Sequence, residues 1–411
     1  MLANLLLMSY MMIEPNYDED KVPSYSLTNP LTFADGRAVT QASDWLERRA
    51  EILQLFETEV YGQTPDKQLP MDVETFGENP NALDGAAIQE QVILRFGASS
   101  PDINLLIYRP KDTIQPVPTF LGLNFHGNHT VHAAPDIRIT KAWVRNNAEL
   151  GVSHNRSSEV GRGGVANRWA IETIIQHGYA LATVYYGDLD PDFDDGFKNG
   201  VHPLFGQTDQ QRMGETWGSI GTWSWGLSRI LDYLETHPNI DGSKVAVMGH
   251  SRLGKTSLWA GAQDPRFALV ISNNSGCGGA ALSRRRFGET VGRINNAFPH
   301  WFCQNFNRYN GNEDQLPIDQ HQLIALIAPR PVYVASAAED LWTDPKGEFL
   351  AAKYADPVYR LLGTEGLPTD QMPELDHAVM GQIGYHIRTG GHDVTLYDWK
   401  RYLDFADRHF R

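Results

Sequence analysis

One strand-to-helix junction constrains the fold of this 411-residue chain more than any other feature of its sequence. Residues 244–262 read KVAVMGHSRLGKTSLWAGA, so an apolar strand runs directly into Gly249-His250-Ser251 and then into a helix. A serine in so tight a turn is strained and presents its hydroxyl, and the position two residues before it needs glycine. The helix behind the turn stabilises negative charge on a reacting oxygen. The junction predicts a nucleophilic Ser251.

The junction also departs from the usual pattern. The common spacing G-x-S-x-G has become G-x-S-x-x-G here, with Leu253 where a small residue is normal. A serine that only caps the following helix is therefore the alternative interpretation at this stage.

The rest of the chain alternates strands with helices of moderate length. Strands are expected at residues 86–96, 103–110, 118–127, 179–187, 244–251, 267–276 and 331–337, and helices at 169–178, 223–238, 253–263, 321–329 and 346–362. Such alternation predicts a mainly parallel central sheet with helices on both faces, a three-layer arrangement. Together with the serine turn it indicates the α/β-hydrolase fold, in which ligands bind beyond the carboxyl ends of the strands.

The segmentation of the sequence suggests one large catalytic unit. Residues 1–40 are expected to form an extended N-terminal arm, and residues 41–411 a single catalytic domain. Residues 131–168 carry His, Asn, Arg and Gly without apolar periodicity, so they are expected to be a long inserted loop.

A serine nucleophile needs a histidine base, and in this fold the chain order is serine, acid, histidine. His392 lies in the turn Thr389-Gly390-Gly391-His392-Asp393 near the chain's end, where the base of such a sheet falls. His386, in a stretch that reads as helical, and His377, after a proline-rich loop, are expected to be structural.

The acid should follow the next-to-last strand, which residues 331–337 are taken to form. Two carboxylates come shortly after it, Glu339 and Asp340. The spacing favours Asp340 as the acid, but Glu339 is one residue away and stays an alternative. A further alternative is that both carboxylates are surface charges near Lys346. The acid would fix the histidine tautomer and stabilise the imidazolium.

Composition excludes several partners. The formal charge of −15 argues against nucleic acid and against anionic membrane surfaces. No apolar run reaches the roughly 18 residues that span a bilayer. Residues 1–13 are apolar but lack a preceding basic residue and a cleavage site. They fit either the remnant of a signal peptide or an apolar end.

The histidines and cysteines point to no cofactor. His126, His129 and His132 lie close together, but the first two belong to LNFHGNHT, where an oxyanion-hole loop is expected, so no metal site is predicted. Cys277 and Cys303 fit either a disulfide or two buried thiols.

Several segments together resemble carbohydrate esterase family 15, the glucuronoyl esterases, in their bacterial form. The matching pieces are GHSRLGK (249–255), SGCGGA (275–280), FPHWFC (298–303), EDLWTDP (339–345) and GHDVTLYDW (391–399), with EVYGQTP (59–65) and LNFHGNHT (123–130). Each piece is weak alone, but their order and spacing are specific, and they extend over nearly the whole chain.

The resemblance implies a role for several residues. Ser251 would attack the ester carbonyl, and Arg252 would stabilise the oxyanion. Lys255 and Glu289 would bind sugar hydroxyls, and Trp342 would contact the sugar ring. Without the resemblance, Lys255 reads as a solvent-facing helix residue, Glu289 as a surface ion pair beside residues 284–286, and Trp342 as core.

Two positions depart from the family. Many members have the catalytic glutamate just before SGxGGA, where this chain has Asn274, so the acid must come from Glu339-Asp340. The family also commonly has cysteine where this chain has His250, which removes one disulfide.

The resemblance implies a secreted or periplasmic, monomeric enzyme without a cofactor that cleaves (4-O-methyl-)glucuronate esters of glucuronoxylan. Two other functions stay open: another hydrolase on the same fold, such as an acetylxylan esterase or a peptidase, and a non-catalytic carbohydrate-binding protein.

Overall fold

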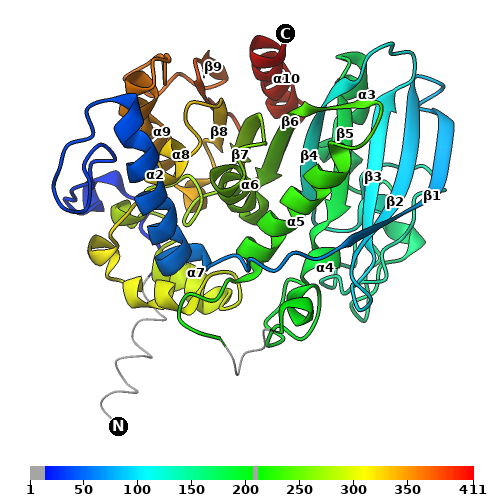
Figure 1. Cartoon of the computed structure of the whole chain (residues 1–411), viewed down its shortest axis with the longest axis horizontal. Coiled ribbons are helices and arrows are strands. Elements are labelled where there is room, and N and C mark those ends of the chain that lie inside the picture. Colours follow the sequence, from blue (N-terminus) through cyan, green and yellow to red (C-terminus); the bar gives the residue numbers. More distant parts are fainter. Residues whose placement is uncertain (1–13, 207–211) are drawn as a thin grey trace.

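The computed structural model describes residues 14–206 and 212–411, so residues 1–13 lie outside it. One ten-stranded sheet runs through the described chain in the order β1-β2-β3-β5-β4-β6-β7-β8-β10-β9 (Figure 1). Its strands are β1 (Met71–Ala82), β2 (Ala87–Phe96), β3 (Ile103–Pro110), β4 (Val117–Asn124), β5 (Ala180–Tyr185), β6 (Ile240–His250), β7 (Leu269–Asn273), β8 (Val332–Ala337), β9 (His377–Met380) and β10 (Ile383–Arg388). The run from β5 to β10 is parallel, which confirms the expected α/β-hydrolase architecture.

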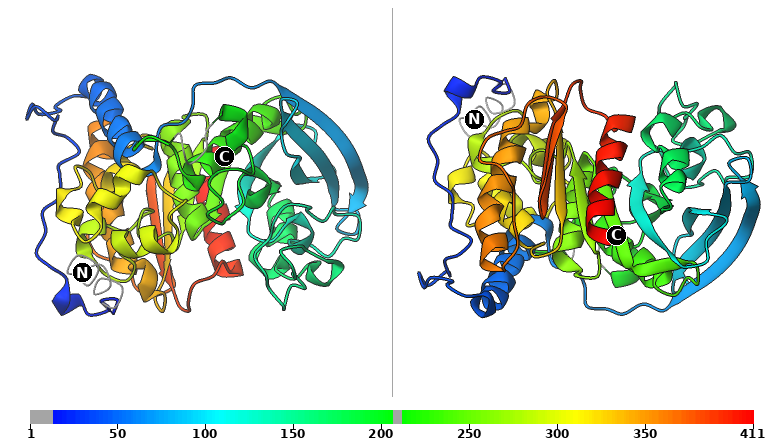
Figure 2. Two further views of the ribbon diagram at one scale, coloured as in Figure 1. Left: turned by 90° about the horizontal axis from the view of Figure 1, so that it is seen from below. Right: turned by 90° about the horizontal axis from the view of Figure 1, so that it is seen from above.

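Helices cover both faces of the sheet (Figure 2). They are α2 (Ala42–Phe56), α3 (Ile171–Gln176), α4 (Tyr186–Leu189), α5 (Ser219–Leu234), α6 (Arg252–Gln263), α7 (Val291–Ala297), α8 (Gln320–Ala325), α9 (Pro345–Leu361) and α10 (Leu396–Phe410), joined by short 3₁₀ turns. One core contains buried residues of α2, α5, α6, α8 and α9, and the other contains those of α3 and α10.

Strand β8 shows how one apolar run serves two cores. Val332 and Val334 belong to the first core, whereas Tyr333 and Ala335 belong to the second. Successive strand residues point to opposite faces, so a strand covered on both faces must be apolar at every position. This explains why the central strands were predictable from uninterrupted apolar stretches.

Three strands at or next to the edges of the sheet depart from the sequence prediction. Strand β1 was not expected, because it is exposed along most of its length and therefore shows no apolar alternation. The stretch around His386 is strand β10 and not a helix. Strands β9 and β10 both follow β8, so residues 331–337 do not form the next-to-last strand of the chain.

The described part of the N-terminal arm lies against the body of the protein. Glu19 contacts Arg285 at 2.5 Å and Lys346 at 2.6 Å, and Thr28 donates a hydrogen bond to Gln322 at 3.0 Å. The division into an arm (1–40) and one catalytic domain (41–411) stays a prediction. None of the described helices combines the length and apolar character that a membrane crossing requires.

The expected loop at 131–168 is folded back onto the sheet by hydrogen bonds. Gln91 of β2 donates to the carbonyl oxygen of Asp136 at 2.9 Å and accepts from the backbone N–H of Arg138 at 2.8 Å. Elsewhere, Cys277 and Cys303 are both buried and free, so the disulfide alternative is wrong.

Candidate active site

The predicted serine turn has the strained geometry that an exposed nucleophile requires. Ser251 stands between β6 and α6 with φ 57° and ψ −128°, a region that non-glycine residues rarely occupy. A Cβ at Gly249 would lie 1.8 Å from the carbonyl oxygen of Leu253, so only glycine fits there. At Gly254 a Cβ would approach Ser275 Cβ to 3.0 Å, which explains why the second glycine stands one position later than usual.

His392 lies opposite this turn and contacts a carboxylate. Its Nδ1 is 2.6 Å from Oδ2 of Asp340, which follows β8 and is 6% exposed. Burial by itself would raise the pKa of Asp340, but the hydrogen bond and charge of His392 outweigh it, and the pKa is lowered. Ser251, Arg252 and His392 line one pocket of about 230 Å³.

The structure separates Asp340 from the neighbouring candidate acid. Glu339 is exposed, and its backbone N–H donates to the carbonyl oxygen of Gly390 at 3.0 Å. Of the two carboxylates, only Asp340 contacts His392 in the described chain. This contact distinguishes Asp340 from Glu339.

The two rival histidines lie elsewhere. His386 is fully buried in β10, between the hydroxyl of Tyr333 at 2.9 Å and the carboxylate of Asp398 at 2.9 Å. His377 is exposed at the start of β9, with Nδ1 2.9 Å from the carbonyl oxygen of Leu375. Neither lines the pocket of Ser251.

Asn274 supports the carboxylate from the other side. Its Nδ2 donates to the same Oδ2 of Asp340 at 2.7 Å, and its backbone has φ 46°. A neutral donor here suits an acid that stands at 340, because a second carboxylate would repel it. This contact was not predicted, although the departure at 274 had marked the position.

His250 packs beside the base without carrying charge. Its Nδ1 is 2.6 Å from Oδ1 of Asn273, and its ring centroid is 4.4 Å from that of His392. Burial lowers the pKa of His250 to about 3, with the charge of His392 adding to the effect. His250 is therefore neutral near pH 7.

Glu348 holds the loop behind this site. The side chain is fully buried in α9 and accepts hydrogen bonds from the backbone of Ser275 at 2.7 Å and Gly276 at 2.9 Å, and from Ser336 Oγ at 2.6 Å. Burial raises the pKa of Glu348 to about 8, although these hydrogen bonds oppose it. Sequence reasoning missed this residue, because a glutamate in a helix reads as a solvated charge.

We expect Glu348 to make stability depend on pH. Between the value of 4.5 for an unfolded chain and about 8, the folded protein holds a proton that the unfolded chain has lost. The free energy of unfolding then falls as the pH rises through this window. Urea unfolding of wild type and Glu348→Gln over this range should show wild type losing stability relative to the variant. A constant difference would contradict this account.

Arg252 belongs to a buried charge network. Its Nη1 donates to Oδ2 of Asp192, and its guanidinium lies 4.7 Å from the ring centroid of Trp301. Asp192 also accepts from His300 Nε2 at 2.9 Å and from Trp301 Nε1 at 2.7 Å. Burial would raise the pKa of Asp192, but His300 and Arg252 outweigh it and lower the pKa. Asp192 was missed, because only the fold brings it beside Arg252.

Lys255 and Glu289 form a buried pair beside this network. Lys255 is 3% exposed, so the solvent-facing alternative is wrong, and its Nζ donates to the carbonyl oxygens of Ser275 at 2.5 Å and Cys277 at 2.7 Å. Oε2 of Glu289 lies 3.6 Å from that Nζ. Burial raises the pKa of Glu289 against the lowering effect of Lys255.

The neighbouring arginines do not pair with Glu289. They contact other acids, namely Arg284 with Asp319, Arg285 with Asp344 and Glu19, and Arg286 with Glu313 and Asp314. The surface ion-pair alternative for Glu289 is therefore wrong.

Trp342 opens toward a second pocket. It is 38% exposed, so it is not a core residue, and its carbonyl oxygen accepts a hydrogen bond from Glu289 N at 2.9 Å. Trp342, Glu289 and Phe298 line a pocket of about 680 Å³. An acidic group and an aromatic face thus meet in this pocket.

No metal centre is evident among residues 14–206 and 212–411, because no three His, Cys, Asp or Glu side chains there are placed to bind an ion. His126 lines the pocket of Ser251, whereas His129 is fully buried.

The fold is that of an α/β-type hydrolase, and its strained serine shares a pocket with a histidine that contacts an aspartate. Comparisons with known proteins agree. The family model "Glucuronyl esterase, fungi" matches residues 204–363. A carbohydrate esterase from an unknown prokaryotic organism is 55% identical over 96% of this chain and 92% of its own length. A 4-O-methyl-glucuronoyl methylesterase from Wolfiporia cocos is 29% identical over 85% of this chain and 74% of its own length.

Solved structures show the same relationship. A promiscuous family 15 esterase from a marine bacterial metagenome superposes with a TM-score of 0.91 at 54% identity, covering 96% of this chain and all of the other. A glucuronoyl esterase from Solibacter usitatus gives 0.90 at 45% identity, covering 95% and 100%. The chain belongs to carbohydrate esterase family 15, the glucuronoyl esterases, and is a carboxylic ester hydrolase.

Proposed function

We propose that the protein hydrolyses esters of glucuronic acid and 4-O-methyl-glucuronic acid, such as those linking glucuronoxylan to lignin alcohols. The observation that carries the proposal is the 2.6 Å contact between His392 and Asp340, in a site whose pocket is shared by Ser251 and Arg252. Relatives named glucuronoyl esterases or 4-O-methyl-glucuronoyl methylesterases support this choice of acyl group.

The proposed reaction proceeds through an acyl-enzyme. Asp340 accepts a hydrogen bond from Nδ1 of His392, so Nε2 is free to take the hydroxyl proton of Ser251 as Oγ attacks the ester carbonyl. His392 then gives that proton to the departing alcohol as the ester C–O bond breaks. A water molecule, deprotonated by His392, attacks the glucuronoyl ester of Ser251, and His392 returns the proton to Oγ of Ser251 as the bond to the acid breaks.

Arg252 is placed to stabilise the negative charge that develops on the carbonyl oxygen. It is held over Trp301 and against Asp192, so it needs little reorganisation during the reaction. Its charge is shared with the buried Asp192, so part of its hydrogen-bonding capacity is already used for positioning.

We expect the Arg252→Lys variant to lose about 10²-fold in kcat with a smaller change in KM. Lysine keeps the charge but cannot span Asp192 and the substrate oxygen with a planar group. Kinetics on benzyl glucuronate test this, with Arg229→Lys on the remote helix α5 as the matched control. An unchanged kcat would remove Arg252 from the oxyanion site.

The sugar contacts favour a uronate over a small acyl group. Lys255 and Glu289 offer a buried donor and acceptor for ring hydroxyls, and the Trp342 face can pack on sugar C–H groups. An acetyl group has no hydroxyl for these residues to bind. The alternative function is that of an acetylxylan esterase, and one structural relative is described as promiscuous.

The test is hydrolysis of benzyl glucuronate beside benzyl acetate under the same conditions. We expect a higher kcat/KM for the glucuronate, because both esters release the same alcohol and differ only in the acyl part. Faster turnover of the acetate would favour the acetylxylan esterase, and turnover of neither ester would favour a non-catalytic carbohydrate-binding protein.

We also propose a secreted or periplasmic location and a monomeric state. The location rests on the substrate, since glucuronoxylan is a polymer found outside cells. Size-exclusion chromatography with light scattering tests the monomer, and a dimer mass would contradict it.

A further inference from the structure

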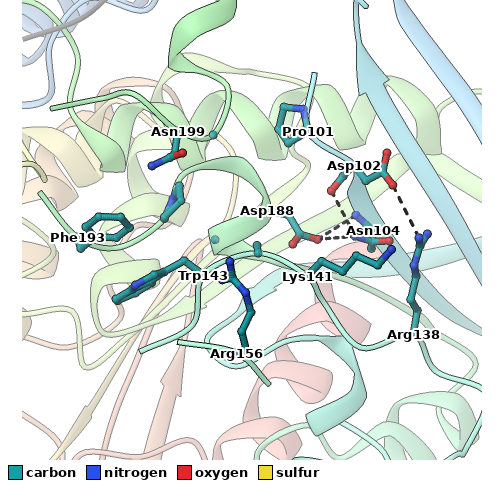
Figure 3. Close-up of a pocket in the computed structure, with 14 residues that line it drawn as sticks. Pro101, Asp102, Asn104, Arg138, Lys141, Trp143, Arg156, Asp188, Phe193 and Asn199 are labelled. Atoms are coloured by element: carbon teal, nitrogen blue, oxygen red, sulfur yellow. Dashed lines mark hydrogen bonds and ion pairs between the residues drawn. The ribbon is translucent and has the colours of Figure 1, made fainter. Parts of the chain in front are cut away.

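A separate pocket lies beside the active site. It has a volume of about 510 Å³ and is bounded by the start of β3, the 131–168 loop and the segment that follows β5. Trp143 and Phe193 form an aromatic pair on one side, with ring centroids 4.6 Å apart. Figure 3 shows Arg138 and Lys141 on the other side, with the Arg156 side chain between them and the aromatic pair.

The cations of this pocket are available to a ligand. Lys141 and Arg156 form no ion pair with any residue in the described parts of the chain, and Lys141 is exposed. Arg138 makes one ion pair within the described residues, a 3.9 Å contact with Asp102, and its guanidinium lies 5.1 Å from the ring centroid of Phe76. Unpaired cations gathered in one pocket are unexpected in a chain of formal charge −15, where acidic partners are abundant.

The two carboxylates of the pocket are already engaged. Asp102 contacts Arg95 at 2.6 Å, outside the pocket lining. Asp188 is 4% exposed and accepts hydrogen bonds from Asn104 Nδ2 at 2.9 Å and Thr140 Oγ1 at 2.7 Å. The charge that remains accessible in the pocket is therefore positive.

The pocket stands at the same end of the sheet as Ser251. Strand order there is β3-β5-β4-β6, so the end of β5 is two strand positions, roughly 10 Å, from the end of β6. The wall between the pockets is shared, because Trp143 and Pro191 line this one while Arg145, which approaches Asp192, lines the pocket of Ser251.

We propose that this pocket is a subsite for a carboxylate-bearing sugar, a further uronate on the polysaccharide whose esterified residue occupies the site of Ser251. The inference rests on the proposed function. Aromatic faces pack on sugar C–H groups, and guanidinium and ammonium groups bind carboxylates. A neutral sugar would use the aromatic pair and leave Lys141 and Arg156 without partners.

The test is calorimetric binding of a xylo-oligosaccharide carrying two glucuronate branches to the Ser251→Ala protein, beside the same oligosaccharide with its carboxyl groups reduced to alcohols. Adding Lys141→Ala and Arg156→Ala should weaken binding of the acidic ligand about fivefold to tenfold. Binding of the reduced ligand should be unaffected. Adding Lys400→Ala, an exposed charge on α10, is the matched control and should change neither.

Three results would overturn the proposal: equal loss for both ligands, no loss for the acidic one, or no binding of the acidic ligand to the parent protein. A Trp143→Ala variant provides a second test, because it should weaken the binding of both ligands. Turnover of benzyl glucuronate by wild type reports on the proposed function separately, so failure of the subsite and failure of the function are distinguishable.

Discussion

The Ser251→Ala variant is expected to lose at least about 10⁴-fold in kcat on benzyl glucuronate. The loss should be this large because no other group can form the acyl-enzyme, and the remaining site can only bind and polarise the ester. The substitution removes one oxygen from a half-buried position, so the fold should be retained. Stopped assays with chromatographic detection of benzyl alcohol would measure the residual rate.

The control for this variant lies on the same strand. Ser243→Ala changes an exposed serine of β6 and should leave kcat unchanged. Thermal unfolding of both variants would show whether a loss of activity arises from the missing hydroxyl or from a loss of stability. A Ser251→Ala protein that retained a substantial part of the wild-type rate would remove Ser251 as the nucleophile.

The second large effect concerns the acid. We expect Asp340→Ala to lower kcat by about 10³- to 10⁴-fold, because Nδ1 of His392 would lose the partner that fixes its tautomer and stabilises the imidazolium. The neighbouring Asn274 cannot replace that charge, although it contacts the same oxygen of Asp340.

Glu339→Ala is the matched comparison, since it removes an adjacent carboxylate that is exposed and makes no hydrogen bond or ion pair with His392 in the described part of the chain. It should retain close to the wild-type kcat. The opposite order of the two variants would show that the acid is Glu339 and that the contact of Asp340 with His392 is structural.

The sheet was predictable where strands are covered on both faces. Strands β4 to β8 contain short apolar runs, such as residues 245–248 of β6 and 332–335 of β8, since each strand supplies side chains to two cores. Strand β1 was not predictable, because an exposed edge strand needs backbone pairing with its neighbour but no apolar side chains. Strands β9 and β10 follow a loop and were not predicted. The fold buries polar residues there, such as His386 and Arg388, and polar residues in a sequence do not indicate a buried strand.

The residues of the candidate site were also predictable only where a short local pattern in the sequence marks them. Ser251 and His392 stand in short local patterns of glycine and strand, so their positions could be predicted from neighbouring residues. Glu348 and Asp192 could not, because each is buried only by segments distant in the chain, and a carboxylate without that context reads as solvated. The sequence likewise could not decide between Glu339 and Asp340, because it does not show in which direction each side chain points.

The most direct test of the central claim links Ser251 to uronate ester hydrolysis in one titration. The protein is treated with increasing amounts of a serine-directed fluorophosphonate, and the fraction labelled at each peptide is compared with the remaining benzyl glucuronate activity. We predict a single label on Ser251, with activity falling in proportion to that label. Full labelling of Ser251 with activity retained, or activity lost with the label on another residue, would contradict the account.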